Sequence, residues 1–177
     1  MRRSISVGLC FCFIILQVPP AHSCGDKLLV LGRTVRLRTA SKPAAILAYA
    51  QPGTPVAALL ENPQWVAACK KGGYRVQAIE DLSQLQTTLL DGHYDLILAD
   101  ISDASHVQEV VRSSPSSPLV IPLVEDRKEL VRTAKKRYAS VVKEHAKSGA
   151  YISAIEDALD LKAGADEARE RASRKKS

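Results

Sequence analysis

The feature that most constrains the fold is a regular alternation of short apolar runs with stretches of helical periodicity, between Lys42 and about Ala163. An apolar run of roughly four to eight residues between turn signals indicates a buried strand, and apolar residues at every third or fourth position indicate an amphipathic helix. Strands that alternate with helices predict right-handed crossovers and a doubly wound, three-layer α/β fold with a five-stranded parallel sheet. The expected strands lie near residues 44–50, 74–79, 95–100, 118–124 and 139–143.

Residues typical of helix ends lie between these runs. Asn62-Pro63 is expected to start a helix as its cap and first residue, and Gly72-Gly73 to end it. Asp81 is expected to cap the next helix. Pro122 makes the fourth strand the weakest of the five, because proline donates no hydrogen bond to a neighbouring strand.

The first 23 residues have the pattern of a secretory signal peptide: two arginines, an apolar run and small residues before residue 24. We therefore expect the chain to be exported, to the periplasm or to a membrane-anchored position facing the periplasm or the cell surface. Cys24 would then be the first residue, where a bacterial lipoprotein carries its lipid. If Cys24 carries lipid, Cys69 is left unpaired, as a small buried apolar residue of a helix. The alternatives are a Cys24–Cys69 disulfide or two free thiols.

The segments on either side of the α/β region are charged. Residues 24–42 are expected to form a basic linker, and residues 164–177 a disordered tail, because the tail lacks an apolar stripe. Loss of Arg2 and Arg3 with the signal peptide lowers the formal charge from +6 to +4. This small excess, together with export, argues against nucleic acid as a partner.

The order and spacing of "GYRV", "DGHYDLILADI", "SPLVIPLV" and "YASVVKE" resemble those of response-regulator receiver domains over residues 43–163. The resemblance implies a flavodoxin-like sheet of strand order 2-1-3-4-5. It also implies that Asp100 stands where that family has its phosphoryl-accepting aspartate, and Lys143 where it has the lysine that contacts the phosphate.

The chain departs from the family at the residues that phosphoryl transfer needs. Ala50 and Gln51 replace the acidic pair that holds Mg²⁺, and without those carboxylates the ion is poorly held. The hydroxyl at the end of the fourth strand is missing, and Glu144 replaces the proline after the lysine. The resemblance therefore implies a degenerate receiver without phosphorylation, in which Asp100 and Lys143 form a partly buried ion pair.

Two classes of function remain open, and an enzyme ranks below both. The first is a non-enzymatic module for signalling or protein interaction, with an unknown protein partner and with lipidated Cys24 as a membrane anchor. The second is a domain that binds a small molecule or an ion at the carboxyl ends of its strands. A working receiver that is phosphorylated at Asp100 is a further alternative. No catalytic residue, metal site or cofactor is predicted, and the polar residues expected near the strand ends are Gln51, Asp100, Ser102, Asp103 and Lys143.

Overall fold

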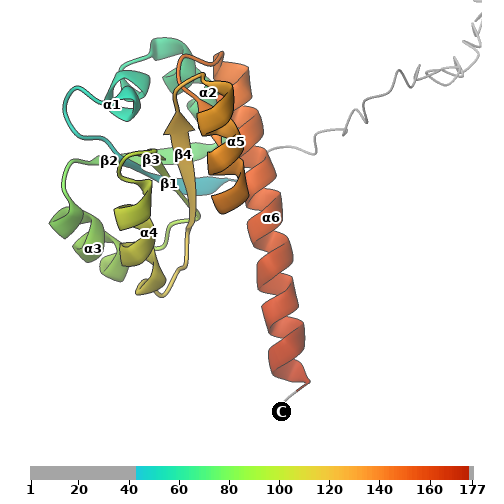
Figure 1. Ribbon diagram of the computed structural model, residues 1–177. Helices are drawn as coiled ribbons and strands as arrows, with labels where there is room; N and C mark the ends of the chain where they lie inside the picture. The colour runs from blue at the N-terminus through green and yellow to red at the C-terminus, as the bar shows by residue number, and fades with distance from the viewer. Residues whose placement is uncertain (1–42, 176–177) are drawn as a thin grey trace, which may run out of the picture. The chain divides into compact units, whose positions relative to one another are not determined.

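All five strands run parallel in one sheet of order β2-β1-β3-β4-β5 (Figure 1). The computed structural model describes residues 43–175. In chain order the elements are β1 (Ala44–Tyr49), α1 (Pro55–Leu60), α2 (Pro63–Gly72), β2 (Tyr74–Ile79), α3 (Leu82–Asp91), β3 (Leu96–Asp100), α4 (Ala104–Arg112), β4 (Leu119–Val124), α5 (Lys128–Arg137), β5 (Val142–Lys143) and α6 (Ser148–Arg174). The predicted α/β class and strand order are confirmed.

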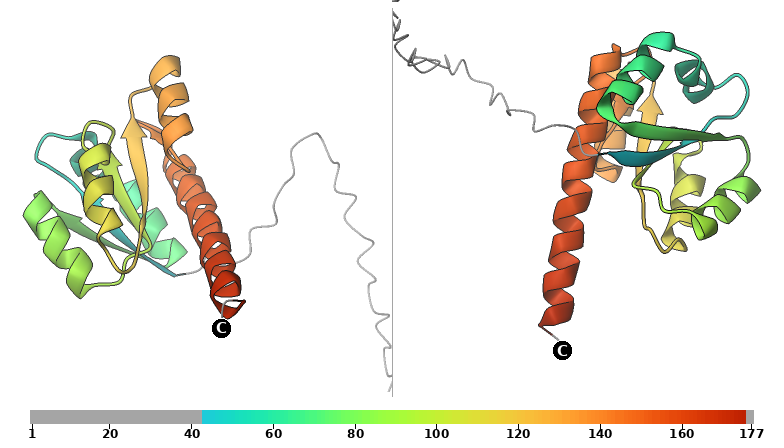
Figure 2. Two further views of the ribbon diagram at one scale, coloured as in Figure 1. Left: turned by 60° about the horizontal axis from the view of Figure 1, so that its bottom comes forward. Right: turned by 180° about the vertical axis from the view of Figure 1, so that it is seen from behind.

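Helices cover both faces of the sheet (Figures 1 and 2). Ile46 and Leu98 point to one face, where they pack with residues of α1, α2 and α6 such as Trp65. Leu47 and Ile97 point to the other face, where they pack with residues of α3, α4 and α5. Successive strand residues alternate between these two cores, so the central strands β1 and β3 are buried throughout, and only the last residue of β3, Asp100, is charged.

The caps predicted from sequence are present. Asn62 accepts hydrogen bonds from the backbone N–H groups of Gln64 and Trp65 at 2.9 and 3.3 Å. Gly73 ends α2 with φ of 75°, a conformation that glycine adopts without strain. Asp81 accepts a hydrogen bond from the Gln84 N–H at 2.8 Å and caps α3.

Pro122 lies inside β4 and is tolerated there because the neighbouring edge strand, β5, is too short to pair with it. The Leu123 carbonyl accepts from Ile101 on the β3 side, and the Val124 carbonyl accepts from Glu144 on the β5 side. By this alternation the Pro122 nitrogen faces the β5 side. Strand β5 pairs only with Leu123 and Val124, so no ladder hydrogen bond is lost at Pro122.

Two predicted element bounds are wrong. The fifth strand was expected over residues 139–143, but only Val142–Lys143 pairs with β4. The tail was expected to be disordered from residue 164, but α6 continues to Arg174. The buried positions of α6 end at Lys162, and the rest of the helix runs beyond the sheet (Figure 2). Pairs four residues apart, such as Glu167–Arg171 at 3.5 Å, support this exposed part.

The predictions for the signal peptide, for Cys24 and for the linker 24–42 fall on residues outside those that the structure describes. They remain predictions. Among the described helices, none has the length and apolar character needed to cross a bilayer.

Cys69 lies on α2 as a buried free thiol. Burial raises its pKa to about 11, from an ordinary value of 9.0. Only the thiolate reacts, so this shift alone lowers the reactive fraction about hundredfold at pH 8. We expect iodoacetamide to leave Cys69 unmodified in the folded protein and to modify it fully in denaturant, as read by peptide mass mapping. Rapid labelling of Cys69 under native conditions would contradict the buried position.

Candidate functional site

Three of the predicted site residues come from strands whose carboxyl ends meet at one edge of the sheet. Asp100 is the last residue of β3, Lys143 is the last residue of β5, and Gln51 comes two residues after β1. Parallel strands direct their carboxyl ends to the same edge, where open α/β sheets place their ligands. Ser102 and Asp103 follow β3 in the turn that leads into α4.

Asp100 is buried at this edge without a hydrogen-bond partner. Its residue is 5% exposed, and among the described residues neither carboxylate oxygen has a partner. The nearby Thr54 hydroxyl has a single proton, which it donates to the Gln51 carbonyl at 2.7 Å. That hydroxyl therefore cannot satisfy Asp100 at the same time.

Burial raises the pKa of Asp100 to about 6, from an ordinary value of 3.8. The carboxylates of Asp103 and Glu144 add to the increase in pKa, because they disfavour another negative charge. Thr54 and the backbone N–H of Val56 lie close enough to oppose it, but they do not outweigh the loss of solvation. The net effect is to raise the pKa of Asp100, so that its carboxyl group stays protonated at a higher pH than an exposed aspartate does.

Lys143 does not neutralise Asp100, so the predicted Asp100–Lys143 ion pair is wrong. The Lys143 ammonium pairs instead with Asp126, in the turn before α5, at 2.5 Å. Both side chains are about half exposed or more, at 51% and 64%. Lys143 stands beside Val124, the last residue of β4, and Asp126 follows only two residues later.

Gln51 and Ser102, two further predicted site residues, form hydrogen bonds with residues close to them in sequence. The Gln51 side chain donates to the Tyr49 hydroxyl at 2.6 Å. The exposed Ser102 hydroxyl donates to the Asp103 carboxylate at 3.2 Å. The structure therefore brings Asp100 and Asp103 close together and adds Glu144, a neighbour that the sequence analysis did not select.

This donor set does not fit a magnesium ion. Within residues 43–175, no three side chains of His, Cys, Asp or Glu are grouped so as to hold a metal. The position after β1 offers the Ala50 methyl group and the amide of Gln51, which is already bonded to Tyr49. Mg²⁺ requires near-octahedral oxygen ligands, which this edge does not offer.

An ion pair at the opposite edge of the sheet was not predicted. Lys162 of α6, 9% exposed, lies with its ammonium 3.6 Å from the Asp95 carboxylate and donates to the Ser116 carbonyl at 3.4 Å. Asp95 also accepts from the Ala45 N–H at 2.9 Å. The sequence did contain a sign of this pair, because Lys162 follows the buried Ala158 by four residues and so lies on the buried face of α6.

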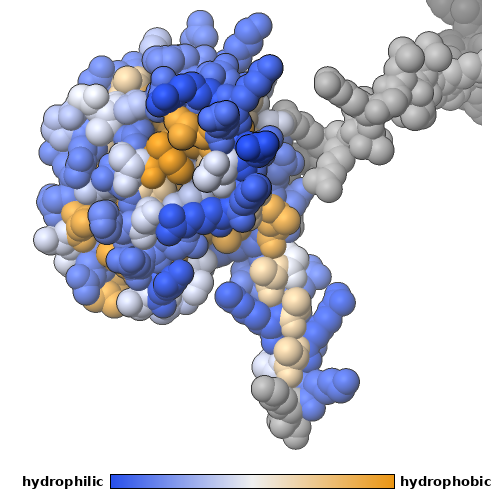
Figure 3. Space-filling view, viewed as in Figure 1, coloured by the Kyte–Doolittle hydropathy of each residue, from blue (hydrophilic) through white to orange (hydrophobic). Residues whose placement is uncertain are grey.

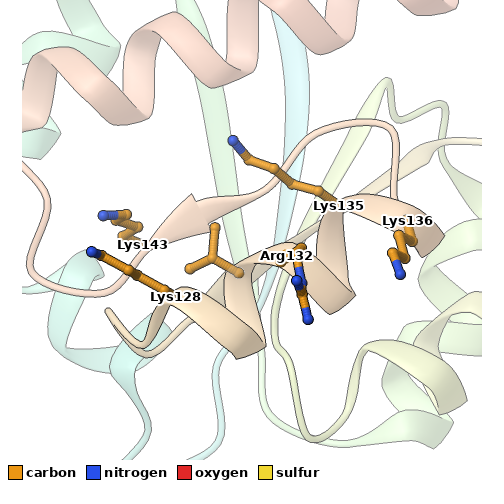
Figure 4. Close-up of a pocket in the computed structure, with 6 residues that line it drawn as sticks. Lys128, Arg132, Lys135, Lys136 and Lys143 are labelled. Carbon is orange, nitrogen blue, oxygen red and sulfur yellow. The ribbon is translucent and has the colours of Figure 1, made fainter.

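A basic hollow on α5 was also missed. It has a volume of about 450 Å³ and is lined by Lys128, Val131, Arg132, Lys135, Lys136 and Lys143 (Figure 4). Asp100 is not among the residues that line it. The run "DRKELVRTAKKR" was the available signal for this surface.

Comparison with known proteins gives the fold alone. No family model matches the chain, and no curated protein matches it. One similar solved structure is described as the trimeric coiled coil of yeast Spc42, amino acids 181–211, fused to another structure. It is 19% identical, with a TM-score of 0.56 over 78% of this chain and 94% of that one.

Proposed function

We propose that this chain is a degenerate, receiver-like domain that acts without phosphorylation and without catalysis, by binding a protein partner at the bacterial cell envelope. The location rests on the secretory pattern of the first 23 residues. The mode of action rests on the surroundings of Asp100.

The burial of Asp100 and the lack of Mg²⁺ ligands around it are the observations that support a function without phosphorylation. A carboxylate that attacks a phosphoryl group must be ionised, reachable, and supported by a cation that neutralises the phosphoryl oxygens. Asp100 is 5% exposed, and the carboxylates needed to hold Mg²⁺ are absent after β1. Lys143, the other residue matched to the family, is bound to Asp126.

Binding of an ion or small molecule at the strand ends has less support. The acidic neighbours Asp103 and Glu144 would favour a cation beside Asp100. Gln51, Ser102 and Lys143, however, have their polar groups bonded to residues other than Asp100. The side chains therefore favour a protein-binding surface elsewhere on the domain over a ligand site at the carboxyl ends of the strands.

The test is exposure of the purified protein to Mg²⁺ and a small acyl phosphate, followed by intact-mass measurement. We expect no mass change, because the described residues around Asp100 offer no group of ligands for Mg²⁺ and its side chain is buried away from the donor. A functional receiver serves as the positive control, and Asp100→Asn as the matched variant. A gain of one phosphoryl group that needs Mg²⁺ and is lost in Asp100→Asn would overturn the proposal.

A further inference from the structure

Helix α5 has an unusual concentration of positive charge. Five of its ten residues are basic, namely Lys128, Arg132, Lys135, Lys136 and Arg137, and Glu129 is its one acid. All five basic residues are exposed. Like charges three or four residues apart repel each other in a helix, and a single acid on α5 cannot neutralise this cluster.

Four of the basic residues on α5 have no acidic partner within residues 43–175. Exposed ion pairs elsewhere join Arg127 to Glu125 and Lys143 to Asp126. No such pair involves Lys128, Arg132, Lys135 or Lys136. Their charge is therefore available to a partner.

These side chains surround a hollow with an apolar floor. Lys128, Arg132 and Lys135 are spaced by four and three residues, which places them on one face of the helix around Val131. Figure 4 shows Lys143 approaching from β5 toward the end of α5 that carries Lys128. In Figure 3, hydrophilic side chains border a small apolar area beside α5.

We propose that this basic hollow binds an acidic segment of a partner protein, whose carboxylates meet the cations while one small apolar side chain rests on Val131. This inference rests on the proposed interaction function and specifies its partner. The hollow has a volume of about 450 Å³, which is large enough for such a side chain and its flanking backbone.

The spacing of the charges favours a polypeptide. Lys128 to Lys136 spans eight residues, or about 12 Å of helix. A single phosphate is too small to contact both ends of this row, whereas about four residues of extended chain match it. Binding to a lipid surface requires apolar side chains that protrude and insert into the lipid, but Val131 is half-buried at the base of the hollow.

The test measures binding of a fluorescent eight-residue peptide of glutamates with one central leucine. We expect saturable binding that weakens as salt rises and that falls at least tenfold in Arg132→Gln/Lys135→Gln. The matched control is Lys70→Gln/Lys71→Gln on α2, which removes the same charge from exposed lysines under the other face of the sheet. It should change the affinity less than twofold.

Several results would overturn this inference. They are absence of peptide binding, equal loss in both double variants, or tighter binding of phosphatidylglycerol vesicles, inorganic phosphate or a nucleic-acid oligomer than of the peptide. Circular dichroism of each variant establishes that it is folded. Failure of peptide binding with an unchanged mass in the phosphoryl test removes this inference and leaves the proposed function in place.

Discussion

Asp100→Asn is expected to stabilise the protein at pH 8, by up to about 3 kcal/mol. The folded state holds Asp100 with a pKa of about 6 against an ordinary 3.8, so between these values the folded state binds more protons than the unfolded state. Stability of the wild type therefore falls as pH rises from about 4 to about 6, and stays lower above that. Asparagine stays neutral and avoids this loss.

Denaturant unfolding at pH 4 and at pH 8 measures the effect. The gain from Asp100→Asn should be present at pH 8 and close to absent at pH 4, where Asp100 is protonated in the fold. Asp91→Asn, at the exposed end of α3, is the matched control and should leave stability nearly unchanged at both pH values. A loss of stability at pH 8 in Asp100→Asn would mean that the ionised carboxylate has a favourable partner.

Whether Asp100→Asn raises or lowers the stability distinguishes the observed arrangement of Asp100 from the ion pair with Lys143 that was expected from the sequence. Had Asp100 been paired with Lys143, its replacement would have left a buried cation unpaired and lowered the stability. With Lys143 bound to Asp126, Asp100 is an uncompensated acid, and its removal is favourable.

Asp95→Ala is expected to cost about 3 kcal/mol, because it leaves the Lys162 ammonium buried without its counter-charge. It also removes the acceptor of the Ala45 N–H. Asp95 thus joins β1 and β3 to the last helix. Lys162→Met in the same background should recover most of the loss, since the unpaired charge goes with it.

Urea unfolding of the two single variants and the double variant gives the coupling energy between Asp95 and Lys162. Asp126→Ala is the matched control, because it breaks the exposed pair with Lys143 and should cost less than about 1 kcal/mol. Equal costs for Asp95→Ala and Asp126→Ala, or no recovery in the double variant, would contradict the assignment of a buried pair at Lys162.

The parts of the fold that the sequence predicts well are those set by local chemistry. The α/β class follows from apolar runs that alternate with helices, whereas the strand order was implied by the resemblance to receiver domains. The helix ends follow from Asn62, Gly73 and Asp81, whose caps involve residues only a few positions away. The long-range pairs could not be predicted in the same way. Lys143 was expected to pair with Asp100, but it pairs with Asp126 in the turn before α5, and the path of that turn is not readable from the sequence.

The extent of α6 was missed for a different reason. An apolar stripe was required of every helix, and residues 164–174 have alanines and charges instead. The acid-to-arginine pairs four residues apart, Glu167–Arg171 and Glu170–Arg174, were the local signal for continued helix.

The two parts of α6 differ in what holds their backbone hydrogen bonds closed. Residues up to Lys162 are packed on the sheet, so their amide protons exchange only when the domain opens. The part beyond is about 18 Å of helix with water on all sides, too short to persist alone. The docked turns act as its nucleus, so we expect it to unwind from Arg174 back toward Lys162, turn by turn, without disturbing the core. Amide protection in this one helix should therefore decline toward Arg174 as a gradient, which no other helix of the domain should show.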